Sequence, residues 1–401
     1  YWLGWSSKTL KIKEFEGAVK RSILTLKLLT YEKTGALLAA ATTSLPEEIG
    51  KNRNWDYRYC WIRDAALTVS VFHSLGHRYL SKKFIDFILS VTPYKREELQ
   101  IMYDIHGRKQ FSEESLLHLS GYLDSQPVRI GNEAFFQKQW DIYGFLMDIM
   151  HTSLTDYKTN LDQAEHLWTM VRNIVRHVQS NWQKKDSGPW EFRDNKQHFV
   201  FSKLLCWVAI DRAIKIAKRL KQFEDYHYWE DLACEIKKDI KTNGFCNKKK
   251  SYMQSYKSQH VDASILLMES YGFISAKDPS YISTVEYIHN TLCHDDGLMY
   301  RYNGSDDFGR PKSAFLVCSF WMIDALYKIG KKTQAKHYFN TLLKYRNHVG
   351  LFSEDVDIKS KRLLGNFPQA YSHLALISTA LLLSNKKPYN PNDFFDGIVL
   401  E

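Results

Sequence analysis

The spacing of apolar residues constrains the fold of this chain more than any other feature of its sequence. Apolar positions recur with the period of an α-helix along nearly all 401 residues, and almost no stretch alternates as a β-strand does. Two kinds of helical segment alternate along the sequence. Residues 228–240 carry charge on one face and apolar side chains on the other, whereas residues 314–323 and 374–382 are apolar nearly all round. A helix of the second kind needs neighbours on every side, so it belongs inside and the first kind outside.

This alternation predicts an all-α fold built from six helical hairpins, with an inner ring of apolar helices inside an outer ring of amphipathic ones. We therefore expect an (α/α)6 toroid. No obvious linker divides the sequence, so residues 1–401 are predicted to form a single domain. The twelve predicted helices cover residues 15–29, 63–75, 81–91, 134–152, 161–179, 201–219, 223–242, 261–271, 281–292, 313–329, 332–344 and 368–384.

The connections between the predicted helices indicate where functional residues should lie. Connections that lead into inner helices are long and rich in Gly, Trp, Arg and carboxylates, whereas most of those that leave inner helices are short. In a toroid the long connections all open at the same end, and long loops on a rigid scaffold are where binding and catalytic groups concentrate. The six long connections are residues 44–63, 93–133, 183–200, 243–260, 293–312 and 345–367.

Composition narrows the classes of function. The formal net charge is +10, but the lysines are scattered and residues 248–250 are the only tight run, which favours a solvated surface over a nucleic-acid interface. No apolar run reaches the roughly 20 residues of a membrane span, and no signal-peptide pattern opens the chain. The chain is therefore predicted to be cytoplasmic, with secretion left open because it starts at Tyr1. Neither cysteines nor histidines have metal-site spacing, so no metal or cofactor is predicted.

Residues 52–64 combine four aromatic residues, three arginines and two carboxylates directly before a predicted inner helix. A pyranose ring offers an apolar face that stacks on aromatic side chains and a rim of hydroxyls that pair with Arg and Asp. This composition is therefore typical of a sugar-binding site. The ordinary alternative, a loop with a charged cap at the start of a helix, is open at this point.

Two long connections each carry a carboxylate in a setting that suits proton transfer. Glu191 stands between Trp190 and Phe192, and apolar walls raise the pKa of a carboxyl group, as a general acid requires. Glu354 has polar and acidic neighbours, which is typical of a carboxylate that stays ionised and activates water. Most glutamates are only solvated surface, so the value of this pair lies in its expected place on one rim. The sequence has no P-loop, GxGxxG, HExxH or GxSxG motif.

Residues 54–64, preceded by residues 42–50, resemble the signature of glycoside hydrolase family fifteen, the family of glucoamylases, glucodextranases and trehalases. Four further blocks match the family in the same order along nearly the whole chain. Five ordered matches are far more specific than any single one. The further blocks are residues 129–132, 188–193, 314–321 and 364–373.

The resemblance implies an inverting hydrolase of α-glucosides with an (α/α)6 barrel. By motif position, Glu191 resembles the family's general acid and Glu354 its general base. The resemblance also implies a pocket for the terminal glucose, whose outer hydroxyls are held by an Arg-Asp pair and whose walls are aromatic. The residues it implies for substrate binding are Arg63 and Asp64 for the hydroxyls, Tyr57 and Trp61 for the walls, and Arg129, Asn132, Trp190 and Arg193 as further sugar contacts.

Three functions stay in competition. The leading one is a glucoamylase-like exo-hydrolase that releases β-glucose from the non-reducing ends of α-glucans or oligosaccharides. The alternative within this class is a trehalase, which cleaves α,α-trehalose. The alternative of another class is a non-catalytic carbohydrate-binding or regulatory barrel, and the presence of both Glu191 and Glu354 argues against it. In the first two cases the partner is an α-glucoside substrate.

The sequence departs from the family pattern in three places. Pro189 stands where bacterial relatives usually have an aliphatic residue, which is expected to shift the acid loop slightly. Lys312 and Ser313 replace an acidic residue followed by Gly, so a polar contact at the rim is in doubt. Relatives of the bacterial and archaeal type carry an N-terminal β-sandwich domain, and this chain is expected to begin near the point where that domain would end.

Overall fold

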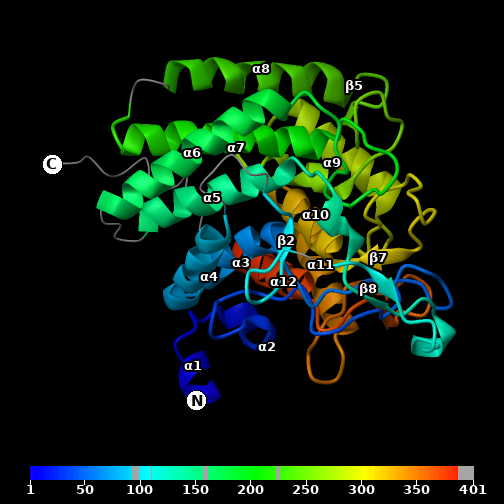
Figure 1. The fold of residues 1–401 in the computed structure, drawn as a ribbon. Helices are drawn as coiled ribbons and strands as arrows, with labels where there is room; N and C mark the ends of the chain where they lie inside the picture. The colour runs from blue at the N-terminus through cyan, green and yellow to red at the C-terminus, as the bar shows by residue number, and fades with distance from the viewer. Residues whose placement is uncertain (93–98, 110, 157–160, 223–225, 387–401) are drawn as a thin grey trace.

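The computed structural model describes residues 1–92, 99–109, 111–156, 161–222 and 226–386. Its regular structure is mainly helical, as predicted (Figure 1). The α-helices are α1 (Trp2–Ser6), α2 (Glu16–Leu29), α3 (Ile62–Ser74), α4 (Arg78–Val91), α5 (Asp141–Asp156), α6 (Leu161–Asn181), α7 (Val200–Arg219), α8 (Tyr226–Gly244), α9 (Pro279–Leu292), α10 (Leu316–Lys328), α11 (Lys332–Leu342) and α12 (Ala370–Leu383). The 3-10 helices are η1 (Lys13–Phe15), η2 (Tyr122–Asp124), η3 (Glu133–Phe136), η4 (Ala263–Met268) and η5 (Leu343–Tyr345).

A closed inner ring organises the described part of the chain. Going round it, α3 contacts α5, α5 contacts α7, α7 contacts η4, η4 contacts α10, α10 contacts α12, and α12 returns to α3. The outer helices α4, α6, α8 and α11 each pack against the inner helix that precedes or follows them, and α9 packs against η4 and α10. Helix α2 packs against α12, so the first long helix meets the last (Figure 1). The predicted (α/α)6 toroid is confirmed.

Burial of side chains follows the predicted division between inner and outer helices. In α10 every residue from Leu316 to Ile323 is buried, whereas α8 buries a stripe that includes Trp229, Leu232 and Ile236. Burying one such aliphatic or aromatic side chain is worth about 1.5–3 kcal/mol. The continuous apolar runs therefore hold the inner ring together, and each outer helix is held through one face.

Three inner elements differ from their predicted bounds. The helix predicted over 313–329 starts at Leu316, because residues 313–315 form a short strand. The segment predicted as a helix over 261–271 forms only the 3-10 helix η4, which a turn with Gly272 at φ +78° follows closely. Helix α5 starts at Asp141 rather than at residue 134, because the backbone is irregular from 137 to 140, after η3. Within this irregular run, the backbone N–H of Trp140 donates to Asp186 Oδ2 (3.0 Å). Of the predicted helix 223–242, residues 223–225 lie outside the described residues.

Short strands, which periodicity did not predict, brace the long connections. They form four small antiparallel sheets in the described residues, and two or three residues are too few to show alternation in a sequence. Sheets β1–β2, β3–β4 and β7–β8–β9 reach the candidate site. The strands are β1 (Cys60–Trp61), β2 (Met102–Tyr103), β3 (Glu114–Ser115), β4 (Arg129–Ile130), β5 (Phe245–Cys246), β6 (Ser251–Tyr252), β7 (Ser313–Phe315), β8 (Asp355–Asp357) and β9 (Leu363–Leu364).

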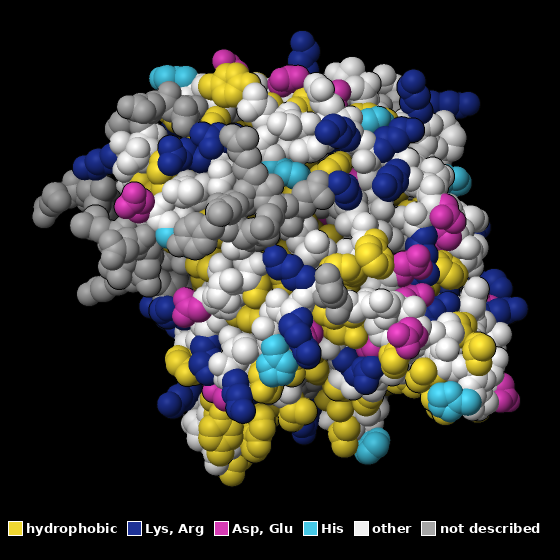
Figure 2. All heavy atoms as spheres, viewed as in Figure 1, with side chains coloured by type: hydrophobic (Ala, Val, Ile, Leu, Met, Phe, Trp, Pro, Cys, Tyr) yellow, Lys and Arg dark blue, Asp and Glu magenta, His cyan; other side chains and the backbone are white. Residues whose placement is uncertain are grey.

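The surface carries charges of both signs. Figure 2 shows Lys and Arg side chains spread over this face from top to bottom, with Asp and Glu between them. Hydrophobic side chains gather at its lower end, where α1 lies and where Tyr1 and Leu3 are exposed. Among the helices of the described residues, none has the length and apolar character that crossing a bilayer requires.

Candidate active site

A pocket lies where the long connections meet, and it encloses about 820 Å³ of empty space that includes its opening to solvent. Two of the ten predicted site residues, Glu354 and Arg129, are absent from its lining. The other eight line it together: Tyr57, Trp61, Arg63, Asp64, Asn132, Trp190, Glu191 and Arg193.

The junction of β1 with α3 forms the deep end of the pocket. Trp61 ends the strand and precedes the helix, which puts Arg63 and Asp64 in the first helical turn. Trp61 Nε1 and Arg63 Nη2 both donate to Glu191 Oε1, at 2.9 and 3.1 Å. Arg63 Nη1 donates to Gln139 Oε1 (3.1 Å), which lies in the irregular run before α5. The late start of α5 thus supplies a side chain that orients Arg63.

The backbone at Glu191 is strained. Its φ of +63° lies in the left-handed region, where a residue other than glycine costs about 1–3 kcal/mol and where functional residues are found more often. The loop is held in this shape by two contacts, Gln137 Nε2 to Glu191 O (3.0 Å) and Glu191 N to Gly188 O (3.2 Å). The result is a carboxylate that is about a quarter exposed and pairs directly with the Arg63 guanidinium.

The aromatic neighbours of Glu191 in sequence do not wall its carboxyl group in the way the sequence predicted. Trp190 donates its indole N–H to Asp262 Oδ2 (2.7 Å), and Phe192 packs with Phe199 and Tyr302 in a separate cluster. Both side chains point away from the Glu191 carboxyl group and contact other segments instead. The expected apolar setting of this carboxyl is therefore wrong, because adjacent residues in an irregular loop point in different directions.

Glu354 lies fully buried behind the pocket wall. Tyr57 O–H donates to its Oε1 (2.6 Å), and its Oε2 has no hydrogen-bond partner among the described residues. Only a glycine at position 365 leaves space for this carboxyl group, because a Cβ there would lie 2.7 Å from Oε2. The φ of Gly365 is +73°, which also favours glycine. Because the Tyr57 and Trp61 rings are edge to face at 5.6 Å, two aromatic rings connect Glu354 to Glu191.

Burial raises the pKa of Glu354 well above its usual range, and the nearby carboxylates Glu47 and Asp355 raise it further. The Arg301 guanidinium and the Tyr57 hydroxyl act in the opposite direction but do not cancel the effect of burial. This setting differs from the polar surroundings that the sequence predicted for Glu354. Its neighbours in sequence are polar, but the folded chain removes its carboxyl group from water.

Asp64 also has a perturbed carboxyl group. Burial raises its pKa to about 7, the Arg63 guanidinium opposes this rise, and Glu191 adds to it. The carboxyl groups of Asp64 and Glu354 therefore both bind protons more tightly than free carboxyls do. Strongly shifted pKa values of this kind cluster at functional sites.

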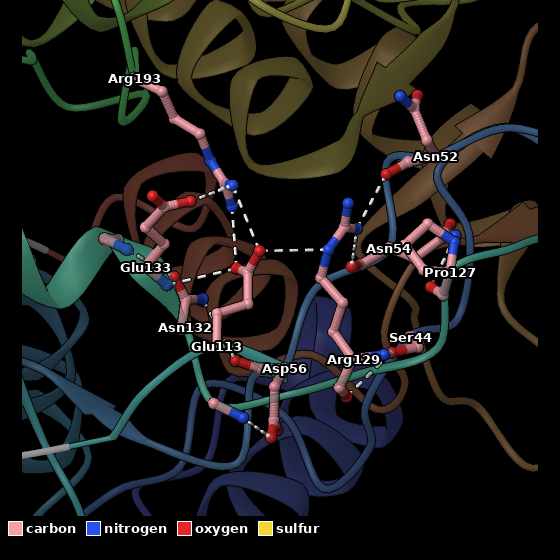
Figure 3. A network of polar contacts seen from close by, with 12 residues as sticks. Ser44, Asn52, Asn54, Asp56, Glu113, Pro127, Arg129, Asn132, Glu133 and Arg193 are labelled. Carbon is pink, nitrogen blue, oxygen red and sulfur yellow. Dashed lines mark hydrogen bonds and ion pairs between the residues drawn. The ribbon is translucent and has the colours of Figure 1, made fainter. Parts of the chain in front are cut away.

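Arg129 supports the pocket from outside it, which corrects the predicted sugar contact. Its Nη1 donates to the backbone oxygens of Asn52 (2.9 Å) and Asn54 (2.7 Å), and its Nε pairs with Glu113 Oε1 (3.2 Å) (Figure 3). The same Glu113 binds Arg193 through both oxygens (Figure 3). Each guanidinium lies about 5 Å from the ring of Trp55, one at 4.8 and one at 5.0 Å. Arg129 therefore fixes the loop that carries Trp55.

Several lining residues were not predicted. Arg53 and Trp55 belong to the 52–64 stretch, whose composition predicts a sugar site but whose first residues match no predicted contact. Others lie in the predicted connection 293–312, where only the general richness in charged and aromatic residues indicated a role, or at the start of the predicted helix 368–384. They are Arg301, Asp306, Asp307, Phe308, Gln369 and Tyr371.

Lys312, one of the departures from the family pattern, does not line the pocket. Its Nζ pairs with Glu48 Oε1 (2.9 Å), and the side chain is about two-thirds exposed. The family's acidic residue is thus replaced by a cation that finds a partner of its own at the surface.

Comparisons with known proteins agree with this geometry. The model of glycosyl hydrolases family 15 matches residues 13–336 and 330–381. A trehalase of Mycolicibacterium smegmatis is 40% identical over 369 residues, which are 90% of this chain and 54% of the relative. A trehalase of Thermoplasma volcanium is 37% identical over 381 residues, which are 95% of this chain and 60% of the relative.

Solved structures show the same fold at low sequence identity. A bacterial glucoamylase complexed with acarbose has a TM-score of 0.75 and 16% identity, over 96% of this chain and 58% of that one. A wild-type glycosidase has a TM-score of 0.73 and 15% identity, over 94% of this chain and 98% of that one. The chain spans somewhat over half the length of the curated relatives it matches. With the family model covering nearly all of it, the chain belongs to glycosyl hydrolases family 15.

Proposed function

We propose that this chain carries the active site of an inverting α-glucoside hydrolase whose substrate is α,α-trehalose. The chemistry rests chiefly on the two carboxyl groups, Glu191 on the pocket face and Glu354 behind Tyr57. The substrate rests on the relatives named trehalase, which are 32–40% identical over at least 90% of the chain. The glucoamylase-like activity, which led the sequence analysis, becomes the second candidate, because glucoamylases share the fold at no more than 16% identity.

In this proposal the deep end of the pocket holds one glucose unit. Its apolar ring face lies against Trp61, and its outer hydroxyls pair with Arg63 and Asp64. Charged partners at fixed positions orient the bond to be cleaved, and such positioning contributes to the rate because reacting atoms are brought into line. The second glucose of trehalose then points toward the mouth of the pocket.

The two carboxyl groups divide the proton transfers. Glu191 donates a proton to the oxygen of the glycosidic bond, so the leaving glucose departs as a neutral sugar. Glu354 takes a proton from a water that attacks the anomeric carbon on the opposite face, which inverts the configuration there. Tyr57 donates to Oε1 of Glu354, which leaves Oε2 as the oxygen without a hydrogen-bond partner among the described residues. One water is consumed for each bond cleaved, and both carboxyls regain their starting states by exchange with solvent.

Incubation with trehalose, maltose and isomaltose, followed by a glucose assay, tests the proposal. We expect trehalose to be hydrolysed with the highest kcat/KM of the three. Preferential hydrolysis of maltose would establish the glucoamylase-like candidate instead. Release of no glucose from any of them would establish the non-catalytic barrel and contradict the proposal.

The raised pKa of Glu354 predicts the pH dependence of hydrolysis. A general base must be ionised, so kcat/KM should fall as the pH drops through the raised pKa of Glu354, at a pH well above the usual range of a glutamate. Glu47→Gln removes a negative charge that raises this pKa, so the acidic limb should move to lower pH. The pKa of Asp64 depends on burial, Arg63 and Glu191 instead, so an unmoved limb would assign it to Asp64 and contradict the role of Glu354.

A further inference from the structure

A tight turn over residues 306–309 forms part of the pocket rim. Asp306 N donates to Gly309 O (3.2 Å), and Gly309 N donates to Asp306 O (3.0 Å). Phe308 N donates to Asp306 Oδ1 (2.8 Å), and Gly309 has a φ of +89°, which glycine adopts without strain. These bonds make the turn a closed, rigid unit, and its residues Asp306, Asp307 and Phe308 all line the pocket.

The turn is fastened to one wall of the pocket by a buried arginine. Arg53 Nη2 donates both to Asp306 Oδ1 (2.5 Å) and to Gly309 O (2.6 Å), and Tyr302 O–H donates to Asp306 Oδ2. The side chains of Arg53 and Asp306 are 6% and 7% exposed. A charge-assisted pair that is so well shielded from water holds its geometry better than a surface pair does.

The same turn is fastened to the loop that carries Glu191. Asp307 accepts the backbone N–H of Arg193 at Oδ2 (2.6 Å) and that of Asp194 at Oδ1 (3.2 Å). The turn therefore spans from the segment of Arg53 to the acid loop and joins two sides of the pocket mouth.

Aromatic and guanidinium groups fill the space beneath this span. The rings of Phe308 and Trp55 are edge to face at 4.8 Å, and the Arg193 guanidinium lies 5.2 Å from Phe308 and 5.0 Å from Trp55. Glu113 and Glu133 fix this guanidinium from the outside (Figure 3). The mouth is thus bounded by groups that cannot swing away independently.

Exposure orders the lining residues from the floor to the rim. Trp61 and Asp64 are 3% and 4% exposed, the Glu191 side chain is 23% exposed, and Asp307 is exposed at the surface. The glucose to be cleaved occupies the floor, so its leaving group must fit between Glu191 and the turn. Asp307, which is exposed, and Phe308, which is partly exposed, line the pocket at the outer end of that interval.

From this arrangement we infer that the 306–309 turn determines specificity for the leaving group, which it limits to a single sugar ring. This inference rests on the proposed function and adds that disaccharides enter, whereas substrates whose leaving group is a longer α-glucan collide with Phe308 and Asp307. The turn acts by its rigid position across the mouth. Removing the ring of Phe308 should therefore admit a second leaving-group sugar.

The test compares trehalose with the trisaccharide in which one glucose of trehalose carries a further α-1,4-linked glucose. Both contain the same α,α-bond, and cleavage of that bond in the trisaccharide releases maltose. Wild-type protein should cleave the trisaccharide at this bond far more slowly than trehalose. We compare the kcat/KM for the trisaccharide divided by the kcat/KM for trehalose. Phe308→Ala should raise this ratio by about 10–200-fold, the usual range when a pocket gains or loses one group. Asp306→Asn, which loosens the turn but keeps the ring, should raise it less.

Lys312→Ala is the matched control, because Lys312 lies in the same connection but outside the pocket and contacts Glu48. It should leave the ratio unchanged. Equal cleavage of both sugars by the wild type would overturn the inference, as would an unchanged ratio in folded Phe308→Ala and Asp306→Asn proteins that cleave trehalose. Release of trehalose and glucose from the trisaccharide, with no cleavage of trehalose itself, would instead contradict the proposed function.

Discussion

Replacing either Glu191 or Glu354 with glutamine should lower kcat for trehalose by about 10²–10⁴-fold, the usual contribution of one general acid or base. Glutamine keeps the size of the side chain and can still accept from Trp61 or Tyr57, but it can neither donate the acid proton nor take the proton of water. Steady-state kinetics on the two variants measure the effect. Circular dichroism should show unchanged helix content, because neither substitution opens a cavity.

A glutamate outside the pocket supplies the control for both substitutions. Glu230 lies on the outer helix α8, is 40% exposed and pairs with Lys218. Glu230→Gln should leave kcat at the wild-type value. If Glu191→Gln or Glu354→Gln hydrolysed trehalose at a rate close to wild type, that residue would not be the acid or base, and the assignment of its proton transfer would be wrong.

Alanine at Arg63 or Asp64 should lower kcat/KM by roughly 30- to 4,000-fold, because truncating one partner of a buried charged contact costs about 2–5 kcal/mol. In the protein without substrate, Arg63 already links Gln139, Asp141 and Glu191. Its loss should therefore also misplace the acid. Contacts remote from the cleaved bond act on kcat as well as on KM, since part of their binding energy positions that bond.

Conservative substitutions separate a loss of substrate binding from a loss of stability. Arg63→Lys keeps the charge but cannot serve three partners with a planar fork of donors, so it should recover little activity. Asp64→Asn keeps an acceptor for a sugar hydroxyl and should lose less than Asp64→Ala. Thermal unfolding of all four proteins reports their stability. Wild-type kcat/KM in a folded Arg63→Ala protein would mean that the floor of the pocket lies elsewhere.

The ring of helices was predictable from the sequence because the side chains that a helix buries form a regular apolar pattern along it. Helix α12 is apolar on every side and α8 along one stripe, and each lies where its pattern indicated. Segment 261–271 was mispredicted because a short buried 3-10 helix and a short buried α-helix have the same apolar composition. The strands were missed because a pair such as β1 and β2 joins two residues to two others across a long loop, which leaves no period.

The site was predictable where its residues are neighbours in sequence and less so where the fold joins distant segments. Trp61, Arg63 and Asp64 fall within four positions, and they line one pocket. The setting of Glu354 depends on Tyr57, which is 297 positions away, and on Gly365, which leaves space for it. Its burial and raised pKa therefore had no counterpart in the sequence around it. The motif that contains Arg129 predicts a sugar contact, and only the folded structure shows that this side chain binds backbone oxygens.

The anomers formed first from trehalose test the proposed mechanism most directly. Inversion at the attacked carbon gives β-glucose, whereas the leaving glucose keeps its α-configuration. Proton NMR, recorded within the first minutes before mutarotation mixes the anomers, should therefore show α- and β-glucose in equal amounts. Formation of α-glucose alone at early times would mean that both units retain their configuration, which would contradict an inverting site built on Glu191 and Glu354.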